Sequence, residues 1–285
     1  MTDIPSSQSP GLNDSTELRV ERLTCSYGHH TVVHDVTFEV PRGTCAALVG
    51  ESGAGKSTIA RVITGMQKPD SGRVFVAGRD IAQNRQISVS RHGEDLGPRW
   101  ARRPAVQMIF QDPISSLNPA RALADIVAEP YEINSDMPCD ERRRRAHTLL
   151  EQVGIDADTY ADARPGEISG GQAQRVAIAR VIAGAPDLLI CDEPVSSLDV
   201  SVQAMVLNLF ADLRDKEGMS MLFISHDLSV VRMISDTIAV LDEGTIVEHG
   251  DTEDVIHHPR HPYTQRLIAS VPSWTHNRHN PNNYA

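Results

Sequence analysis

The sequence has 285 residues, of which 40% are hydrophobic, so it can bury one large α/β core with a small added subdomain or extension. Its 27 basic and 38 acidic residues give a formal net charge of −11, which supplies no overall positive field for phosphate backbones and argues against a nucleic-acid partner. No apolar stretch approaches the roughly 18 residues of a membrane span, so we expect any membrane association to come through a partner protein.

The first residues predict a disordered tail over residues 1–16. They are rich in Ser, Pro and Asp and lack the basic start and apolar stretch of a signal peptide. The four cysteines lie far apart without a CxxC pair, which favours reduced thiols in a cytosolic compartment. They are Cys25, Cys45, Cys139 and Cys191.

Short β segments come next. Three alternating or β-branched stretches within residues 18–40, separated by Gly28 and polar residues, predict an antiparallel β layer. The apolar run 44–49 ends in glycine, as buried parallel strands do. A helix is predicted over residues 56–66 from its apolar face, and a further strand over 72–76.

The middle of the chain changes character. Residues 79–104 are charged and predict a solvated connection, whereas residues 122–160 carry apolar positions at helical spacing and predict a mostly α insertion. After it the α/β pattern returns. The expected helices cover residues 172–183 and 202–214, and the expected strands cover residues 188–191, 221–224, 238–241 and 245–247.

A phosphate-binding loop is predicted at residues 50–57, which fit G-x-x-x-x-G-K-[ST] between an apolar strand and an amphipathic helix. The glycines let backbone N–H groups turn inward around phosphate oxygens, and the helix adds its positive end. Lys56 is expected to reach the β- and γ-phosphates and Ser57 to bind Mg²⁺. An incidental glycine-rich turn is the weaker alternative. The residues expected to bind the nucleotide here are Gly50, Glu51, Ser52, Gly53, Ala54, Gly55, Lys56, Ser57 and Thr58.

Two adjacent carboxylates end the strand predicted over residues 188–191. Strand ends of open α/β sheets are where ligands bind, and burying an unpaired charge is costly, so the pair indicates a function. We expect Asp192 to hold Mg²⁺ directly or through water and Glu193 to act as the general base that polarises the attacking water. A surface turn is the alternative for this pair taken alone.

The residues just before the acidic strand distinguish among NTPase classes. The sequence ISGGQ at residues 168–172 resembles the LSGGQ signature of ABC ATPases, with Ile for Leu. Further positions match that family in order: Tyr27 for adenine stacking, Gln111 as the Q-loop residue near the γ-phosphate and Mg²⁺, Asp199 in the D-loop and His226 as the switch histidine. Each has an ordinary structural alternative when taken singly.

This resemblance covers residues 18–270 and implies a P-loop NTPase fold of ABC ATPase type. That fold has a RecA-like mixed-sheet core, an antiparallel β subdomain and an α-helical insertion. The residues at the signature start a helix, whose free N–H groups form a second phosphate site. In ABC proteins that site closes over the nucleotide of a second subunit in a head-to-tail dimer. The signature residues are Ser169, Gly170, Gly171 and Gln172.

Residues 111–119, 198–204 and 261–267 resemble the oligopeptide/dipeptide importer ATPases, a subfamily that includes nickel and metallophore importers. The resemblance implies two permease subunits, a second ATPase subunit that is identical or paralogous, and indirectly an extracytoplasmic solute-binding protein. It places the chain peripherally at the cytoplasmic face of the membrane. The implied boundaries are an ATPase domain over 17–250 with a helical subdomain over 112–168, an extension over 251–274 and a disordered tail over 275–285.

The C-terminal region also bears on metal binding. Some relatives carry a cysteine cluster for an iron–sulfur centre there, but no cysteine follows Cys191, so we predict no cluster. A solvated, proline-interrupted tail is favoured over a metal site for its histidines. These are His257, His258, His261, His276 and His279.

Two other functions fit the sequence less well. A non-transport ABC ATPase usually has two ATPase domains or a long coiled-coil insertion, neither of which fits 285 residues. A binding module with a decayed site is disfavoured because the expected catalytic residues are all present.

Overall fold

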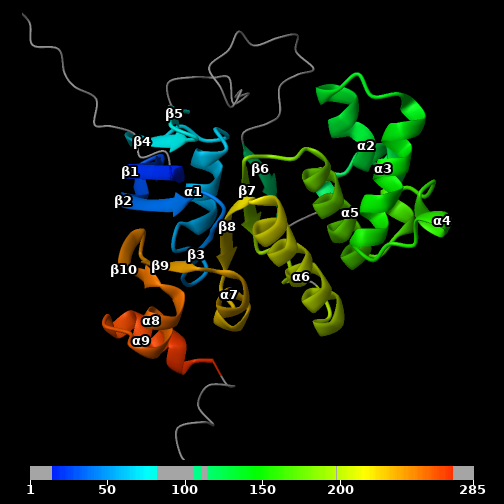
Figure 1. The fold of residues 1–285 in the computed structure, drawn as a ribbon. Helices are drawn as coiled ribbons and strands as arrows, with labels where there is room; N and C mark the ends of the chain where they lie inside the picture. The colour runs from blue at the N-terminus through cyan, green and yellow to red at the C-terminus, as the bar shows by residue number, and fades with distance from the viewer. Residues whose placement is uncertain (1–14, 82–105, 111–113, 197, 272–285) are drawn as a thin grey trace, which may run out of the picture.

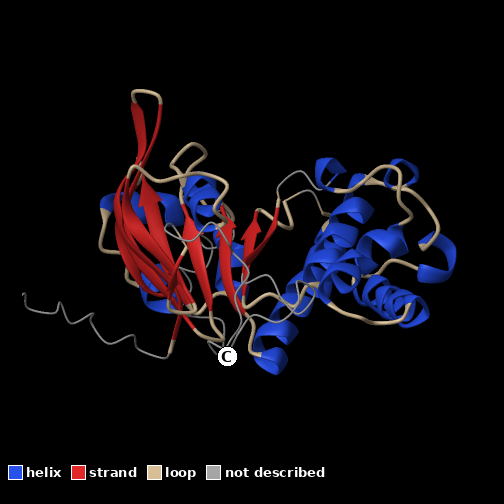
Figure 2. Cartoon of the chain, turned by 90° about the horizontal axis from the view of Figure 1, so that it is seen from above, coloured by secondary structure: helices blue, strands red, loops and turns tan. Residues whose placement is uncertain are grey.

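The computed structural model describes residues 15–81, 106–110, 114–196 and 198–271. They form two sheets, with a group of helices beside the larger one (Figures 1 and 2). Within these residues no helix is both long and apolar enough to cross a bilayer. The tails expected at either end fall largely outside this description, although Thr16 already begins the first strand.

The first sheet is the predicted antiparallel layer, with strand order β2-β1-β4-β5. Two long strands replace the three short segments, because the alternating pattern continues through the interruptions by β-bulges. The strands are β1 (Thr16–Tyr27), β2 (His30–Pro41), β4 (Ser71–Val76) and β5 (Arg79–Asp80). The rest of the predicted connection, residues 82–105, lies outside the described chain.

The second sheet has strand order β10-β9-β3-β8-β7-β6, parallel except for β10. Its strands are β3 (Cys45–Val49), β6 (Val106–Ile109), β7 (Leu188–Asp192), β8 (Ser220–Ser225), β9 (Thr237–Asp242) and β10 (Thr245–Asp251). The short strand β6 was not predicted. Val49 pairs with Ser225 and Asp192 with Ile224, so the segments after β3, β7 and β8 leave the sheet at one edge.

Helix α1 (Lys56–Ile63) packs in the core between the two sheets. Its buried Ile59 and Ile63 join Leu48 of β3 and Val74 of β4 in one apolar cluster. The helix is three residues shorter than predicted, because Gly65 directly after its cap adopts a left-handed backbone with φ 71°.

The helical group is formed by the elements predicted over residues 122–160 together with the helix that follows the signature (Figure 2). Helix α5 joins this group to the larger sheet, since its apolar face packs in the same cluster as Leu189, Cys191 and Phe223. The helices are α2 (Leu123–Asn134), α3 (Cys139–Gln152), α4 (Ala157–Tyr160) and α5 (Gly170–Ala183), with short 3-10 turns at Ile114–Ser116 and Pro165–Glu167. Helix α6 (Val200–Glu217) packs against the same group.

The C-terminal residues fold back onto the larger sheet, contrary to the expected solvated tail. After α7 (Leu228–Ile234), helices α8 (Thr252–His257) and α9 (Pro262–Ala269) bury apolar side chains against β3 and β9. The interpretation of residues 257–261 as a solvated tail was wrong because the apolar residues around them are few and pack against residues far away in the sequence. His276 and His279 lie outside the described residues.

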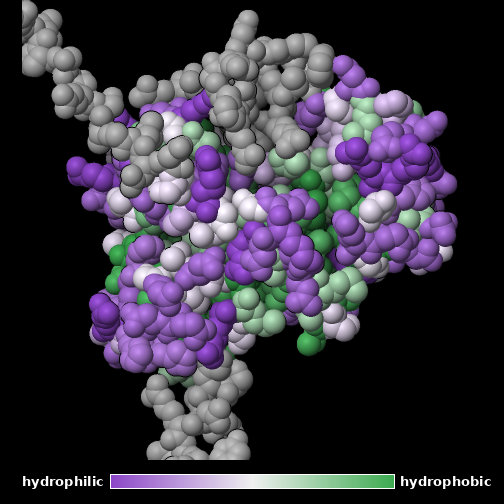
Figure 3. All heavy atoms as spheres, in the orientation of Figure 1, coloured by the Kyte–Doolittle hydropathy of each residue, from purple (hydrophilic) through white to green (hydrophobic). Residues whose placement is uncertain are grey.

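The outer face of this C-terminal region remains hydrophilic, as the lower left of Figure 3 shows. His257 and His258 are exposed there and face acidic side chains, with His257 3.1 Å from Glu253 and His258 3.3 Å from Asp254. His261 instead caps α9 by accepting a hydrogen bond from a backbone N–H.

Candidate active site

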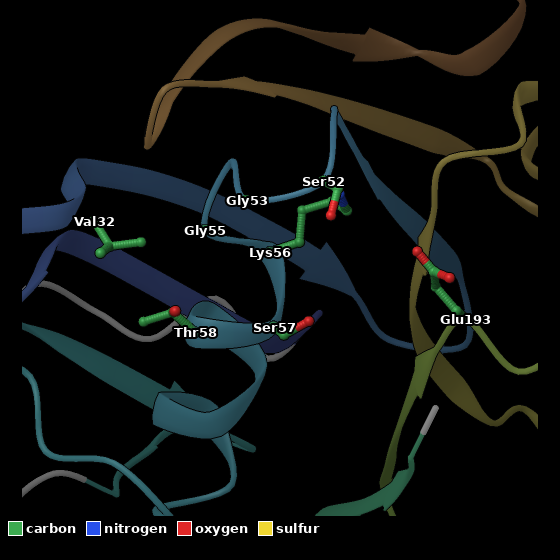
Figure 4. A pocket seen from close by; sticks show the side chains of 8 residues that line it. All are labelled: Val32, Ser52, Gly53, Gly55, Lys56, Ser57, Thr58 and Glu193. Carbon is green, nitrogen blue, oxygen red and sulfur yellow. The ribbon is translucent and has the colours of Figure 1, made fainter. Parts of the chain in front are cut away.

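A pocket of about 240 Å³ opens where the phosphate-binding loop faces the acidic end of β7 (Figure 4). Figure 4 shows the Glu193 side chain across the pocket from the loop and from the start of α1. The lining residues are Val32, Ser52, Gly53, Gly55, Lys56, Ser57, Thr58 and Glu193.

The loop needs its glycines because the neighbouring backbone comes very close. A Cβ on Gly50 would lie 2.2 Å from the carbonyl oxygen of Leu241, and one on Gly55 would lie 2.9 Å from that of Val32. Gly55 also has φ 105°, a conformation that other residues rarely adopt. The loop therefore keeps its N–H groups near the start of α1 only with glycine at these positions.

Lys56 is buried beneath the loop, with 6% of its surface exposed. Its Nζ donates hydrogen bonds to the carbonyl oxygens of Gly50 (2.7 Å) and Glu51 (2.8 Å). Burial lowers the pKa of the Lys56 ammonium, and the nearby carboxylates of Glu193 and Asp192 oppose that shift. This places a positive charge within the pocket lining, as an anionic phosphate requires.

Asp192 ends β7 and is also buried, with 6% of its surface exposed. Burial raises the pKa of its carboxyl group, while a hydrogen bond from Ser57 lowers it. A buried carboxylate beside a hydroxyl oxygen offers the hard oxygen ligands that Mg²⁺ prefers, so these two residues fit the ion.

Glu193 adopts a strained backbone, with φ 50° in a non-glycine residue. Its N–H donates to the carbonyl oxygen of Ile224 (2.9 Å), which ties the turn to β8. The Nδ1 atom of His226 lies 3.0 Å from Oε1 of Glu193, and a protonated Nδ1 donates a hydrogen bond to that carboxylate. Two residues from different strand ends thus meet beside the loop.

Tyr27 lies beside the pocket rather than in its lining among the described residues. Its hydroxyl donates to Oε1 of Gln67 (2.5 Å), and 46% of the residue's surface is exposed. A hydrogen bond with Thr58, which does line the pocket, is the main cause that lowers the pKa of Tyr27. Thr58 therefore links the Tyr27 hydroxyl to the edge of the pocket.

The signature residues form the start of α5. Ser169 caps the helix by accepting a hydrogen bond from the N–H of Gln172 (3.2 Å), and the Gln172 side chain accepts one from the N–H of Ser169 (2.9 Å). Ser169 and Gly170 are exposed, and in the described part of the chain none of the four signature residues lines the pocket. Figure 1 shows α5 on the other side of β7 and β8 from α1.

The side chains of the remaining predicted residues are not found in the described pocket lining. Asp199 caps α6, accepting hydrogen bonds from the N–H groups of Ser201 (3.1 Å) and Val202 (3.0 Å). Gln111 lies outside the described residues. Glu51 and Ala54 belong to the loop, but their side chains are not in the pocket lining as described.

Two contacts to the loop were not predicted. The N–H of Glu51 donates to the hydroxyl of Tyr263 (2.9 Å), and the N–H of Gly244 donates to the carbonyl oxygen of Ala54 (3.1 Å). Tyr263 lies in the stretch 261–267 that carries the subfamily resemblance. That resemblance was the one sequence signal that could have drawn attention to Tyr263.

Comparison with known proteins supports one family. A model described as "ABC transporter" matches residues 33–196, and one described as "Oligopeptide/dipeptide transporter, C-terminal region" matches residues 247–284. The chain is 43% identical over 237 residues to the dipeptide transport ATP-binding protein DppF of Haemophilus influenzae, covering 83% of this chain and 69% of that protein. It is 42% identical over 241 residues to the oligopeptide transport ATP-binding protein OppF of Lactococcus lactis subsp. lactis, covering 85% and 72%.

A solved structure agrees with the fold. The chain superposes with TM-score 0.72 and 26% identity on a dimeric ATP-binding cassette in a post-hydrolysis state bound to ADP and Pi, covering 82% of this chain and 98% of that one. The predicted P-loop fold, with its antiparallel layer, mixed sheet and helical insertion, is confirmed. With a phosphate loop, an acidic strand end and a capped signature helix on that fold, the chain belongs to the ABC transporter family of ATP-hydrolysing subunits.

Proposed function

We propose that this chain is the ATP-hydrolysing subunit of an importer for di- or oligopeptides, working at the cytoplasmic face of the membrane with two permease subunits. The observation that carries the catalytic part is the meeting of Glu193 and His226, 3.0 Å apart, beside the loop that holds Lys56. The peptide part rests on the likeness to DppF and OppF and on the match of residues 247–284.

Each side chain has a distinct task in this proposal. Lys56 and the loop N–H groups bind the β- and γ-phosphates, and the aromatic ring of Tyr27 stacks on adenine. Ser57 and Asp192, with Gln111, would hold Mg²⁺, and the ion would neutralise charge on the phosphates. Glu193 accepts a proton from the attacking water, and His226 fixes the orientation of that carboxylate.

The site is completed by a second subunit, either identical or paralogous. Ser169 and Gly170 are exposed at the start of α5, where free N–H groups and the helix dipole favour an anion. Since α1 of their own chain lies on the other side of β7 and β8, we propose that they cover the γ-phosphate bound to the partner. The likeness to a dimeric cassette supports this arrangement.

The test uses Glu193→Gln in the full chain, reconstituted in vesicles with its permeases and binding protein. ATP hydrolysis and uptake of a labelled dipeptide should both fall by about 10²-fold or more, because the amide cannot accept the proton, while dimers with bound ATP accumulate. Phosphate release measures hydrolysis, the label retained inside the vesicles measures uptake, and size-exclusion chromatography measures the dimers.

Glu217→Gln, at the exposed end of α6, is the matched control and should behave like the parent. Hydrolysis by Glu193→Gln near the parental rate would refute the assignment of the base. ATP-driven flux of another solute without dipeptide uptake would retain the ATPase and reject peptide import.

A further inference from the structure

One peptide unit of the phosphate-binding loop is held at both ends. Its carbonyl oxygen, that of Gly50, accepts a hydrogen bond from Nζ of Lys56 at 2.7 Å. Its N–H, that of Glu51, donates to the hydroxyl of Tyr263 at 2.9 Å. A peptide unit is planar, so fixing both polar ends sets its rotation about the chain. The Tyr263 hydroxyl therefore helps to fix the direction of the Gly50 carbonyl oxygen, which accepts the hydrogen bond from Lys56.

Tyr263 is itself rigidly placed. Only 5% of its surface is exposed, and its ring belongs to a cluster that contains Val49 at the end of β3 and Val240 of β9. The backbone just before it is fixed as well, because the N–H groups of Arg260 and His261 donate to the Glu248 carboxylate at 2.8 and 3.0 Å. The hydroxyl thus approaches the loop from a packed helix rather than from a free surface.

The same extension also holds the helix after the switch histidine. Arg232 of α7 makes a bidentate ion pair with Glu253 of α8, at 2.8 and 2.9 Å. The hydroxyl oxygens of Ser235 and Thr252 lie 3.0 Å apart. This contact reaches α8 without touching the loop. It offers a way to loosen the extension while leaving the Tyr263 hydroxyl in place.

We propose that Tyr263 is a positioning residue for nucleotide binding: its hydroxyl fixes the Gly50–Glu51 peptide so that Lys56 and the loop present a preformed phosphate site. The inference rests on the proposed function, since it assigns this residue to the same ATP site. Without the hydroxyl, the N–H of Glu51 loses its partner and the peptide can rotate, which removes an acceptor from Lys56.

The test is Tyr263→Phe in the full chain, which keeps the ring and removes only the hydroxyl. The Kd for ADP and the KM for ATP should each rise about three- to tenfold, the effect of one hydrogen bond, while kcat changes less than about twofold. Hydrogen exchange of the loop peptide should quicken. Calorimetry, steady-state kinetics and mass spectrometry provide these measurements.

Two controls separate positioning from general loosening. Tyr160→Phe removes a hydroxyl in α4, away from the loop, and Arg232→Gln breaks the ion pair between α7 and α8. Both should leave the Kd for ADP at the parental value, although Arg232→Gln should lower the melting temperature.

An unchanged Kd in Tyr263→Phe, a fall in kcat alone, or an equal rise in Kd in Arg232→Gln would overturn the inference while the proposed function stands. A parent chain that binds no ADP would overturn both.

Discussion

Asp192, which we propose to hold Mg²⁺, is buried at a cost in folding stability. Its carboxyl group ends a fully buried strand, and burial raises its pKa more than the hydrogen bond from Ser57 lowers it. A raised pKa in the folded chain means that the group contributes stability below its ordinary pKa and that this contribution is lost as pH rises through the raised value. At neutral pH the ionised, buried carboxylate is therefore unfavourable.

Asp192→Asn should accordingly melt higher than the parent at neutral pH, by about 2 to 4 °C, while Mg²⁺-dependent hydrolysis falls by about 10²-fold or more. The gain should shrink as pH falls towards the ordinary carboxyl pKa, because the parent carboxyl is then protonated. Thermal melts across pH measure this.

Asp215→Asn is the matched control, since Arg214 lowers the pKa of that exposed carboxyl group and its removal should give no gain. A melting temperature for Asp192→Asn at or below the parental value at neutral pH would contradict the account.

Among the elements, α5 is capped at its first turn by a residue that we also propose to face the partner's nucleotide. Ser169 caps the helix with its side-chain oxygen, which leaves the outward N–H groups of the turn exposed for an anion. A long side chain at that position would fill the space in front of the helix start. It would not disturb the pocket of its own chain, whose lining comes from other elements.

Ser169→Arg should therefore block hydrolysis while the Kd of the single chain for ADP changes less than about twofold; the lost cap costs about 1 kcal/mol of folding stability. Ser169→Thr keeps the capping oxygen and is the control that should retain activity. Phosphate release and calorimetry test both variants. A similar loss of ADP affinity in the single chain would contradict a site shared between subunits.

Sequence patterns identified the elements whose signals are local. The loop at 50–57 combines glycine spacing with a strand and a helix, and the Ser169 cap follows the capping-box pattern with Gln172, so both could be found in short windows. Strand β6 was missed because four residues are too few to show a period. The packing of α9 was missed because Tyr263 meets Glu51 across 212 residues of sequence.

At the scale of the whole molecule, the phosphate loop and the signature helix start lie on separated parts of one chain, α1 and α5 (Figure 1). Two identical surfaces related by a two-fold axis would bring each loop to the other chain's helix start. Each composite site would then need one intact loop and one intact helix start from different chains.

Mixing Lys56→Ala with Ser169→Arg tests this complementarity, since each variant alone should be inactive. In the mixed dimer the Ser169→Arg chain keeps its loop and the Lys56→Ala chain keeps its helix start, so one of two sites is intact. Random pairing should restore about a quarter of the parental hydrolysis rate, if both chains pair with one another. Mixing two preparations of Lys56→Ala is the control, and no recovery in the mixed sample would count against reciprocal sites.

The tight turn between β9 and β10 has a consequence for how a triphosphate binds. Gly244 has no room for a side chain, because a Cβ would lie 2.2 Å from the carbonyl oxygen of Val32. Its N–H donates a hydrogen bond to the carbonyl oxygen of Ala54 in the phosphate-binding loop. Segments from three distant parts of the sequence thus shape the cradle before any nucleotide arrives. Since little chain entropy would be lost when the ligand enters, most of its interaction free energy would remain available to close the proposed dimer.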